Sequence, residues 1–405
     1  MRQRMTRLAV GLLALGGMAP AAWTQAAWAQ EAPAPEVRLG AGFVPHVSGE
    51  LAVDLYGVST YRAPSRNDRF RDLYAKAALS AGLHLAESVV IQGVLKFEPV
   101  AGGPTGGQDR AFQDQGAWID ALYAEWRADP RLTLTAGKFT APFGRGWDNL
   151  PGIRLTDQVS IYEITESIGA MARATVVEDA DGWGEHRLSA AVFTFDTTSL
   201  SSTAVTRKRF GRNEADRYRR NSRGLGGAGN TGTLDNAAVA LEGERIGALP
   251  GFTYQVAVLS RGAGSDGRAR EWGTAIGASW EIPWTEEIST TLFAEAVRFR
   301  NAGGRPVEDV DGVPTPIAER RTITTLAAQT TYGPWRGSIG WQVEDRNRSA
   351  NGMARSSYLE ATVGRELGLG FTADIGWSRT RAGTEEGGRG STDAALVLVG
   401  WRQGF

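Results

Sequence analysis

The chain has 405 residues, and its 44 basic residues nearly balance its 45 acidic ones, which excludes a general nucleic-acid binder. It has no cysteine, which excludes disulfides, thiolate catalysis and cysteine-ligated metal sites. Its length and its 52 glycines and 13 tryptophans fit either a two-domain periplasmic protein or one large β-barrel.

The first 29 residues have the order of a secretory signal peptide. Arg2, Arg4 and Arg7 form a basic start, residues 8–19 are apolar, and Ala27-Trp28-Ala29 is a small-x-small cleavage site. Glycines and a proline interrupt the apolar run, which is therefore shorter than the roughly 20 residues that a spanning helix needs. We expect this segment to be removed on export.

From Val47 onward, apolar and polar residues alternate with a period of two, which is the period of a β-strand. Many of these segments run for ten residues or more, about the length that a tilted strand needs to cross a bilayer. Their apolar sets often end in aromatic residues, as with Trp272 and Trp280, and such pairs are typical of the aromatic girdles of membrane barrels. The polar positions would then face the lumen, and we assign to it Glu50, Asp54, Lys76, Gln92 and Lys96.

Sixteen such segments follow one another, and the connections between them alternate in length. Short turns on one side and long loops on the other are typical of outer-membrane barrels, with an even strand number and both ends periplasmic. The sequence therefore predicts an all-β fold, a transmembrane antiparallel up-and-down barrel of about 16 strands (16–18), with short periplasmic turns and long extracellular loops. The predicted division is a signal peptide at 1–29, a short periplasmic linker at 30–46 and the outer-membrane barrel at 47–405. The predicted strands are 47–60, 69–85, 88–98, 116–127, 131–139, 167–177, 186–196, 234–246, 252–261, 271–282, 288–300, 319–332, 335–345, 355–365, 369–380 and 392–405.

Segment 116–127 departs from the pattern. Trp118, Leu122 and Trp126 are expected to face lipid, but Asp120 shares their phase and would be costly there. A bulge or a subunit contact is needed to shelter it.

The last strand ends in an aromatic signal. Trp401 and Phe405 share one face of the segment, and the sequence given stops on Phe405. This ending resembles the signal that the outer-membrane assembly machinery reads in bacterial barrels, although Gln403 interrupts the apolar series.

The fifth segment closes on a distinctive motif, made of Gly137, Lys138, Phe139, Pro142, Phe143 and Gly144. In physical terms Pro142 removes a hydrogen-bond donor from the strand ladder and Gly144 permits a turn, so the motif could simply terminate a strand. The segment Leu132–Gly144 also resembles a strand of the phosphate-selective porin O/P group and of related LbtU-type siderophore porins. The resemblance covers about 25 residues, and it implies a 16- to 18-stranded diffusion channel, commonly a homotrimer. It does not imply phosphate specificity, because no lysine and arginine ladder is found along the lumen phase.

The loop after this motif, residues 140–166, carries charges of both signs: Arg145, Asp148, Arg154, Asp157, Glu163 and Glu166. In general porins the corresponding loop folds into the barrel, where opposed charges select solutes by size and charge. The alternative is an outer loop whose polar residues face water. If the loop lines the pore, exchange of Arg145 or Arg154 should shift ion selectivity.

A second loop, 197–233, is rich in arginine, with Arg207, Arg209, Arg212 and Arg217 among its basic residues. It would bind lipopolysaccharide phosphates or gather anionic solutes at the pore mouth. The alternative is a mobile loop that its charge keeps soluble.

We therefore expect a porin in the bacterial outer membrane that lets small hydrophilic solutes diffuse through a lumen narrowed by loop 140–166, with weak ion selectivity. Its expected partners are outer-membrane lipids and lipopolysaccharide, the assembly machinery and the solutes, and no nucleic acid. The alternatives are a non-conducting barrel that binds a ligand or serves in structure or adhesion, and a siderophore-uptake porin. No enzyme activity, cofactor or metal is expected, because the only histidines are His46, His84 and His186 and the Ser80–His84 pair points into the lumen by phase.

Overall fold

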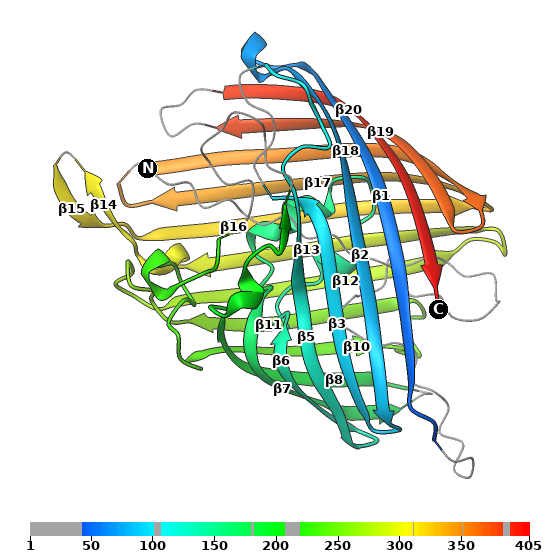
Figure 1. Ribbon diagram of the computed structural model, residues 1–405. Helices are drawn as coiled ribbons and strands as arrows, with labels where there is room; N and C mark the ends of the chain where they lie inside the picture. Colours follow the sequence, from blue (N-terminus) through cyan, green and yellow to red (C-terminus); the bar gives the residue numbers. More distant parts are fainter. Residues whose placement is uncertain are drawn as a thin grey trace.

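The computed structural model describes residues 43–100, 107–179, 182–206, 219–310, 312–350, 352–383 and 389–405. The predicted signal peptide lies outside these ranges, so its removal stays a prediction. Sixteen antiparallel strands form one closed barrel, in which β1 pairs with β20 to complete the ring (Figure 1). The fold predicted from the sequence is confirmed.

The strands of the wall are long and pair in chain order. They are β1 (His46–Arg62), β2 (Phe70–Ala86), β3 (Val89–Pro99), β5 (Gln115–Asp129), β6 (Leu132–Phe139), β7 (Ser167–Asp179), β8 (Gly184–Phe195), β10 (Asn236–Glu244), β11 (Phe252–Arg261), β12 (Glu271–Pro283), β13 (Ile288–Arg300), β16 (Glu319–Tyr332), β17 (Trp335–Arg348), β18 (Gly352–Gly368), β19 (Phe371–Gly383) and β20 (Arg389–Gly404). Closure leaves no open sheet edge along most of the ring, which is what a sheet in a lipid environment requires.

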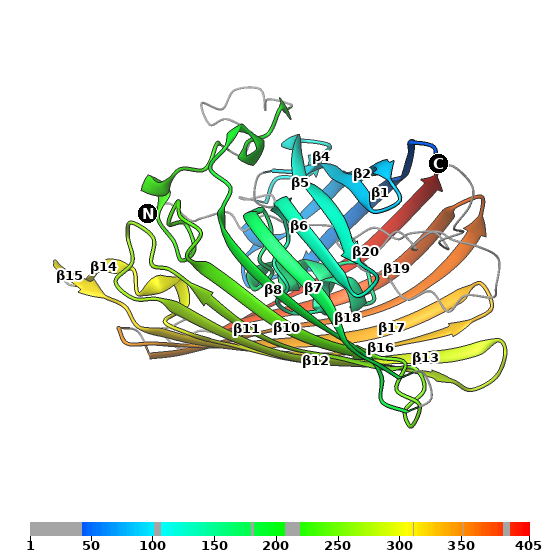
Figure 2. The ribbon, with the colours of Figure 1, turned by 90° about the horizontal axis from the view of Figure 1, so that it is seen from below.

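The structure also contains short helices and strands outside the wall. They are the 3-10 turns η1 (Arg66–Asp68), η2 (Thr156–Ile161), η3 (Ser199–Ser201), η4 (Arg223–Leu225) and η5 (Ala302–Gly304), the helix α1 (Gly146–Asn149), the short strands β4 (Arg110–Ala111) and β9 (Val205–Thr206), and the hairpin β14 (Val307–Val310) and β15 (Val313–Pro316). The hairpin projects away from the wall (Figures 1 and 2). No described helix is long and apolar enough to span a membrane.

The two rims of the barrel differ. Tight turns such as that between Tyr332 and Trp335 join the strands at one end, which we call the turn rim. The long connections lie at the other end, the loop rim. Phe405 joins the ring at the turn rim, where its backbone N–H donates to the carbonyl of Gly49 at 2.9 Å and its carbonyl accepts from Gly49 N–H at 3.0 Å.

The outward face of the wall is apolar, with aromatic residues toward both rims. Trp272 and Trp280 on β12 are both exposed, as are Trp335 and Trp341 on β17. Between them lie aliphatic side chains such as Ile276. This apolar outer band between aromatic ends is the surface of a barrel that lies in a membrane.

The wall is lower at β6 than at β5. Leu122 of β5 pairs with Lys138, so β6 does not reach residues 115–121 of its neighbour. There β9 pairs with Gly116 and Ala117 instead. The chain thus leaves the wall after Phe139, and a later segment covers the edge of β5 that remains.

Residues 140–166, which we call the inner loop, lie inside the ring of strands. Phe143, Trp147, Leu155 and Tyr162 of this loop are buried and belong to one hydrophobic cluster with wall residues such as Phe299. Seen from below, β10–β13 and β16–β18 form one long curved wall that faces the strands from β1 to β8 (Figure 2). The inner loop therefore packs against the inner face of the wall.

Candidate functional site: the inner loop and the lumen

The inner loop leaves the wall through the motif at 137–144. Gly137 has a φ of +137°, and a Cβ atom there would lie 2.5 Å from the carbonyl oxygen of Leu122 on β5. Only glycine allows β6 to pair so closely at this point. Phe143 then packs on β13, with its ring centroid 5.7 Å from that of Phe299. The motif therefore directs the chain into the lumen.

Replacing Gly137 by alanine should lower the yield of folded barrel strongly, because the new methyl group collides with backbone rather than with a movable side chain. The heat-modifiable shift of the folded barrel on a semi-native gel measures that yield. Gly337→Ala on β17 is the control, since a Cβ atom there would meet nothing closer than 4.0 Å. Equal yields for the two variants would contradict the assigned role of Gly137.

Glu295, in the middle of β13, holds the first part of the inner loop. Its carboxylate accepts hydrogen bonds from the backbone N–H groups of Arg145, at 2.6 Å, and Gly146, at 3.2 Å. The hydroxyl of Tyr162, from the far end of the loop, also donates to it. Glu295 is 3% exposed, so these three donors take the place of water around a buried charge.

Glu360, in the middle of β18, holds the next part of the loop in the same way. It accepts from the backbone N–H of Ile153 at 2.5 Å, from that of Arg154 at 3.0 Å, and from the hydroxyl of Tyr358 at 2.5 Å. Beside it, Leu155 lies over Gly340 of β17, where a Cβ atom would come within 2.0 Å of the leucine. At each of two places along the loop, two consecutive backbone N–H groups thus donate to one carboxylate of the wall.

A third contact ties the loop to β2. Lys76 donates to Asp157 at 2.9 Å, and Arg154 approaches the other oxygen of the same carboxylate at 3.1 Å. The side chains of Lys76 and Asp157 are only 3% and 4% exposed. Lys76 also lies 4.8 Å from the ring centroid of Tyr56. With its contacts on β13, β17, β18 and β2, the inner loop reaches across the lumen.

Between the inner loop and the turn rim lies a cavity of about 630 Å³. Arg145, Asp148 and Glu163 of the loop line it, facing Lys96 and Asp120 of the wall. Lys96 pairs with Asp120 at 2.9 Å, and its ammonium lies 5.5 Å from the ring centroid of Trp147. Charges of both signs therefore face each other across this part of the lumen.

Glu163 is the least compensated of these loop charges. One of its carboxylate oxygens is buried without a hydrogen-bond partner among the described residues. Burial raises the pKa of Glu163 well above its usual range, against the opposing charge of Lys96 and with the help of Asp120, Asp148 and Glu98. A group of this kind gains its charge only as the pH rises beyond the ordinary carboxyl range.

The strand that carries Asp120 contains a bulge, which is one of the two arrangements considered for sheltering this residue. β3 pairs Val94 with Ala121 and then Leu95 with Ile119, so the register skips Asp120 and the aspartate turns to Lys96. The bulge also reverses the phase of the residues before it. The prediction that Trp118 faces lipid is therefore wrong, because its side chain is 2% exposed and lies inside.

The inner-loop residues chosen from the sequence fall into three places. Arg145, Asp148 and Glu163 line the cavity, whereas Arg154 and Asp157 form the buried contact with Lys76. Glu166 lies elsewhere: it pairs with Lys138 at 3.1 Å on the outer side of β6 and does not belong to the group of lumen charges.

The residues assigned to the lumen from their phase lie on the inward-facing sides of β1, β2 and β3. Glu50, Asp54, Lys76 and Lys96 are buried there, and Gln92 shares the phase of Lys96. Asp54 pairs with Arg402 of β20 at 3.4 Å, across the seam where the barrel closes.

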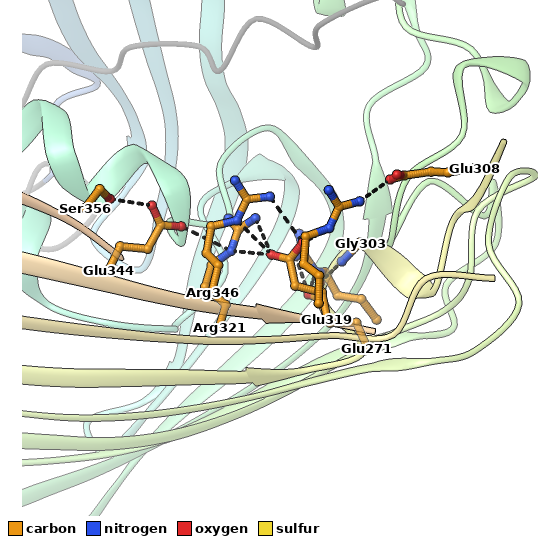
Figure 3. A network of polar contacts seen from close by, with 10 residues as sticks. Glu271, Gly303, Glu308, Glu319, Arg321, Glu344, Arg346 and Ser356 are labelled. Carbon is orange, nitrogen blue, oxygen red and sulfur yellow. Dashed lines mark hydrogen bonds and ion pairs between the residues drawn. The ribbon is translucent and has the colours of Figure 1, made fainter. Parts of the chain in front are cut away.

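A denser charge network lines the lumen at the loop rim. The carboxylate of Glu319 on β16 accepts from Arg321 at 2.9 Å and from Arg346 on β17 at 3.2 Å (Figure 3). Arg348 lies 3.4 Å from the same carboxylate and also donates to Glu308 of the hairpin. Three arginines at this rim thus meet at one acid, and two of them also pair with Glu344 and Glu308, so that the charges of the network balance.

The sequence did not identify Glu295 and Glu360, the two carboxylates that hold the loop. Both occupy lumen-phase positions in the middle of long strands, among residues of low polarity such as Phe293 and Ala361. An isolated acidic residue in the middle of a lumen-facing strand needs a partner, and this requirement could be inferred from the sequence. The sequence did not indicate that the partner is a loop far away in the chain.

His84 lies on the same face of β2 as Ser80, in the register that pairs Ser80 with Glu50 and His84 with His46. Its Nε2 atom lies 2.8 Å from Ser48 Oγ, and its ring stacks on that of His46 with the centroids 4.4 Å apart. Within the part of the chain that the structure describes, no cluster of three metal-ligand side chains occurs.

Comparison with known proteins gives a fold. No family model and no curated protein matches the sequence. The structure is similar to OmpF of Salmonella typhi in its complex with daunomycin, at 11% identity with a TM-score of 0.54, over 88% of this chain and 97% of that one. It is also similar to the outer membrane channel DcaP of Acinetobacter baumannii, at 9% identity and a TM-score of 0.53, over 89% and 97% of the two chains. A loop L8 deletion mutant of OmpT, an outer membrane protein of Vibrio cholerae, matches at 9% identity and a TM-score of 0.51, over 89% and 99%. The chain thus has the fold of an outer-membrane porin-type barrel.

Proposed function

We propose that the protein is a porin of the bacterial outer membrane, through which small hydrophilic solutes diffuse past the inner loop. The observation that carries this proposal is the fixation of the inner loop inside the barrel by Glu295, Glu360 and Asp157. A loop held at three points can narrow a lumen to a defined size. The apolar outer band with its aromatic ends supports a membrane setting, with the turn rim on the periplasmic side.

The charges around the cavity favour cations. Four of its lining side chains are basic and six are acidic: Lys96, Arg145, Arg187 and Arg245 against Asp120, Asp148, Glu163, Glu242, Glu244 and Glu281. Arg187 and Arg245 are already paired with glutamates of the same rim. The remaining excess of negative charge should attract small cations into the narrow part of the pore.

The proposal is tested by adding the purified protein to planar bilayers. Stable ohmic conductance and a reversal potential in asymmetric KCl that indicates preference for K⁺ would support it. Absence of conductance at high protein load would favour a barrel that binds a ligand or serves in structure or adhesion. One observation favours that second candidate: the inner loop buries large apolar side chains such as Leu150 and Val159 in the middle of the lumen.

Two loop charges should move the selectivity in opposite directions. Arg145→Ala removes a positive charge from the cavity lining and should strengthen the preference for cations. Glu163→Gln should weaken it at a pH above the raised pKa of Glu163, where the carboxyl is charged. Reversal potentials in asymmetric salt measure both changes, and unchanged values would contradict the place given to these residues.

The same measurement should depend on pH. Because the pKa of Glu163 is raised, its carboxyl is neutral in mildly acidic solution and becomes charged as the pH rises through the raised value. Preference for K⁺ should therefore increase with pH in the parent protein. The change should be smaller in Glu163→Gln, and an equal pH dependence in both would exclude Glu163 as the titrating group.

Membership of the porin O/P group and a homotrimeric state are further parts of the proposal. The first rests on the motif at 137–144, whose glycine and two phenylalanines act together at the start of the inner loop. The predicted lipopolysaccharide contact rests on basic residues of which Arg207, Arg209, Arg212 and Arg217 lie outside the described residues. Chemical crosslinking in detergent would test the trimer. A siderophore-uptake porin stays an alternative that uptake assays would distinguish.

A further inference from the structure

Lys138, the lysine of the motif at 137–144, points away from the lumen. Lys138 shares its register position with Leu122 of β5 and Ile168 of β7, so its side chain leaves the wall on the outer side. A lysine on this side of a barrel would be expected to reach water. Instead its side chain is 1% exposed.

Three acceptors surround the ammonium of Lys138. Its Nζ atom lies 3.1 Å from Glu166 Oε2, 3.0 Å from Asp196 Oδ2 and 2.9 Å from the carbonyl oxygen of Leu200. The ammonium donates hydrogen bonds to Glu166 and to the Leu200 carbonyl, and the carboxylate of Asp196 forms an ion pair with it. The segment that carries Asp196 and Leu200 covers the lysine on the outside.

These acceptors belong to two different loops. Glu166 is the last residue of the inner loop, and Asp196 opens the connection that follows β8. The two are also joined through the backbone, since the Asp196 N–H donates to the carbonyl of Glu166 at 3.0 Å. Lys138 lies on β6, the strand from which the inner loop departs. It pairs with Glu166, which directly precedes β7, the strand to which the loop returns.

From Asp196 the connection runs on to β5. We call residues 196–206 the outer strap. Its Ala204 N–H donates to the carbonyl of Ala117 at 2.8 Å, and β9 continues the pairing along the edge of β5 that β6 leaves uncovered. Thr203 of the strap is 4% exposed. The strap therefore closes the gap in the wall that arises where the inner loop turns inward.

We propose that Lys138 is a positioning residue that couples the outer strap to the inner loop, so that neither can move while the ammonium holds Glu166 and Asp196. Removing the charge leaves two carboxylates facing each other on a buried site, and both segments loosen together. The effect on conductance rests on the proposed function, whereas the coupling itself does not.

The test uses the absence of cysteine from the sequence. Thr203→Cys reports on the strap, and Val159→Cys, at a site 0% exposed in the inner loop, reports on that loop. Each reporter is combined with Lys138→Gln, and the rate of maleimide labelling is measured in folded, detergent-solubilised protein. Lys138→Arg should preserve the parent rates. Arg131→Gln, which removes an exposed ion pair with Glu178 near the other end of β6, is the matched control.

We expect Lys138→Gln to raise both labelling rates about tenfold or more, the change that follows from losing hydrogen bonds to a buried charge. A rise at Thr203→Cys alone would overturn the coupling, and no rise at either site would overturn the role of Lys138 altogether. Should Lys138→Gln fail to fold, Asp196→Asn gives the same test, with a smaller rise expected at both sites and the same results overturning the proposal. Because labelling needs no current, a parent protein that does not conduct would contradict the proposed function and leave this test intact.

Discussion

A barrel that carries Glu295→Ala and Glu360→Ala together should conduct severalfold more current than the parent protein, with larger fluctuations. Each substitution removes one carboxylate that accepts from two consecutive backbone N–H groups of the inner loop. A buried donor without an acceptor costs about 1–3 kcal/mol. With both carboxylates absent, the loop should leave its place across the lumen for water, and the pore should widen.

Single-channel recording in planar bilayers measures this effect, and liposome swelling with sugars of increasing size gives the new size limit. Glu281→Ala is the matched control. Glu281 lines the same cavity from β12 but makes no hydrogen bond to the inner loop in the described part of the chain. Each single variant should fall between parent and double variant. A double variant with parental conductance would show that the loop does not limit the current.

The second large effect is expected on stability. Asp157→Ala should lower the free energy of unfolding by about 3–5 kcal/mol, because it leaves a buried ammonium without its carboxylate. Lys76 is that ammonium, at 2.9 Å from Asp157, and neither side chain has appreciable access to water. Arg154, which approaches the other oxygen of the carboxylate, is 29% exposed and can be hydrated after the change.

The double variant Asp157→Ala with Lys76→Met provides the decisive comparison. It replaces both charges and should recover most of the lost stability, since a paired charge and an apolar pair of similar volume often contribute about equally. Urea unfolding in detergent, followed by tryptophan fluorescence, gives the midpoints. Equal losses in the single and double variants would mean that the ion pair itself, rather than the isolated charge, determines the stability.

Most of the wall could be predicted because its signal is local. The segments 252–261, 288–300 and 319–332 are strands with the predicted bounds, since each has an unbroken alternation that ends at a turn. The exception was the strand with Asp120, where one bulged residue moves Trp118 from the lipid side to the inside. A single extra residue leaves the composition unchanged and reverses the face, so alternation alone could not detect it.

The candidate site was less accessible to sequence reasoning. The inner loop was found from its charges and from the motif before it, yet its anchors were not. Glu295 and Glu360 lie more than a hundred residues further along the chain, and their partners are backbone amides, which carry no sequence signature. Glu166 is the opposite case. The sequence analysis assigned it to the pore constriction, but in the structure it pairs with Lys138 on the outer side of β6. Which face a loop residue takes depends on contacts that only the assembled barrel provides.

The closure of the ring between β1 and β20 bears on the order in which the molecule can be built. Residues that lie more than 300 positions apart must meet before the wall is complete, and the entropy of closing so long a segment is lost before the final ladder forms. The acceptors for the inner loop stand on β13 and β18, both of which follow the loop in the chain. Until those strands have joined the sheet, the amides at 145–146 and 153–154 have no carboxylate to bind. The inner loop is therefore among the last parts of the molecule to reach its final position. In a partly assembled barrel, the first strands would be paired before the inner loop is fixed across the lumen.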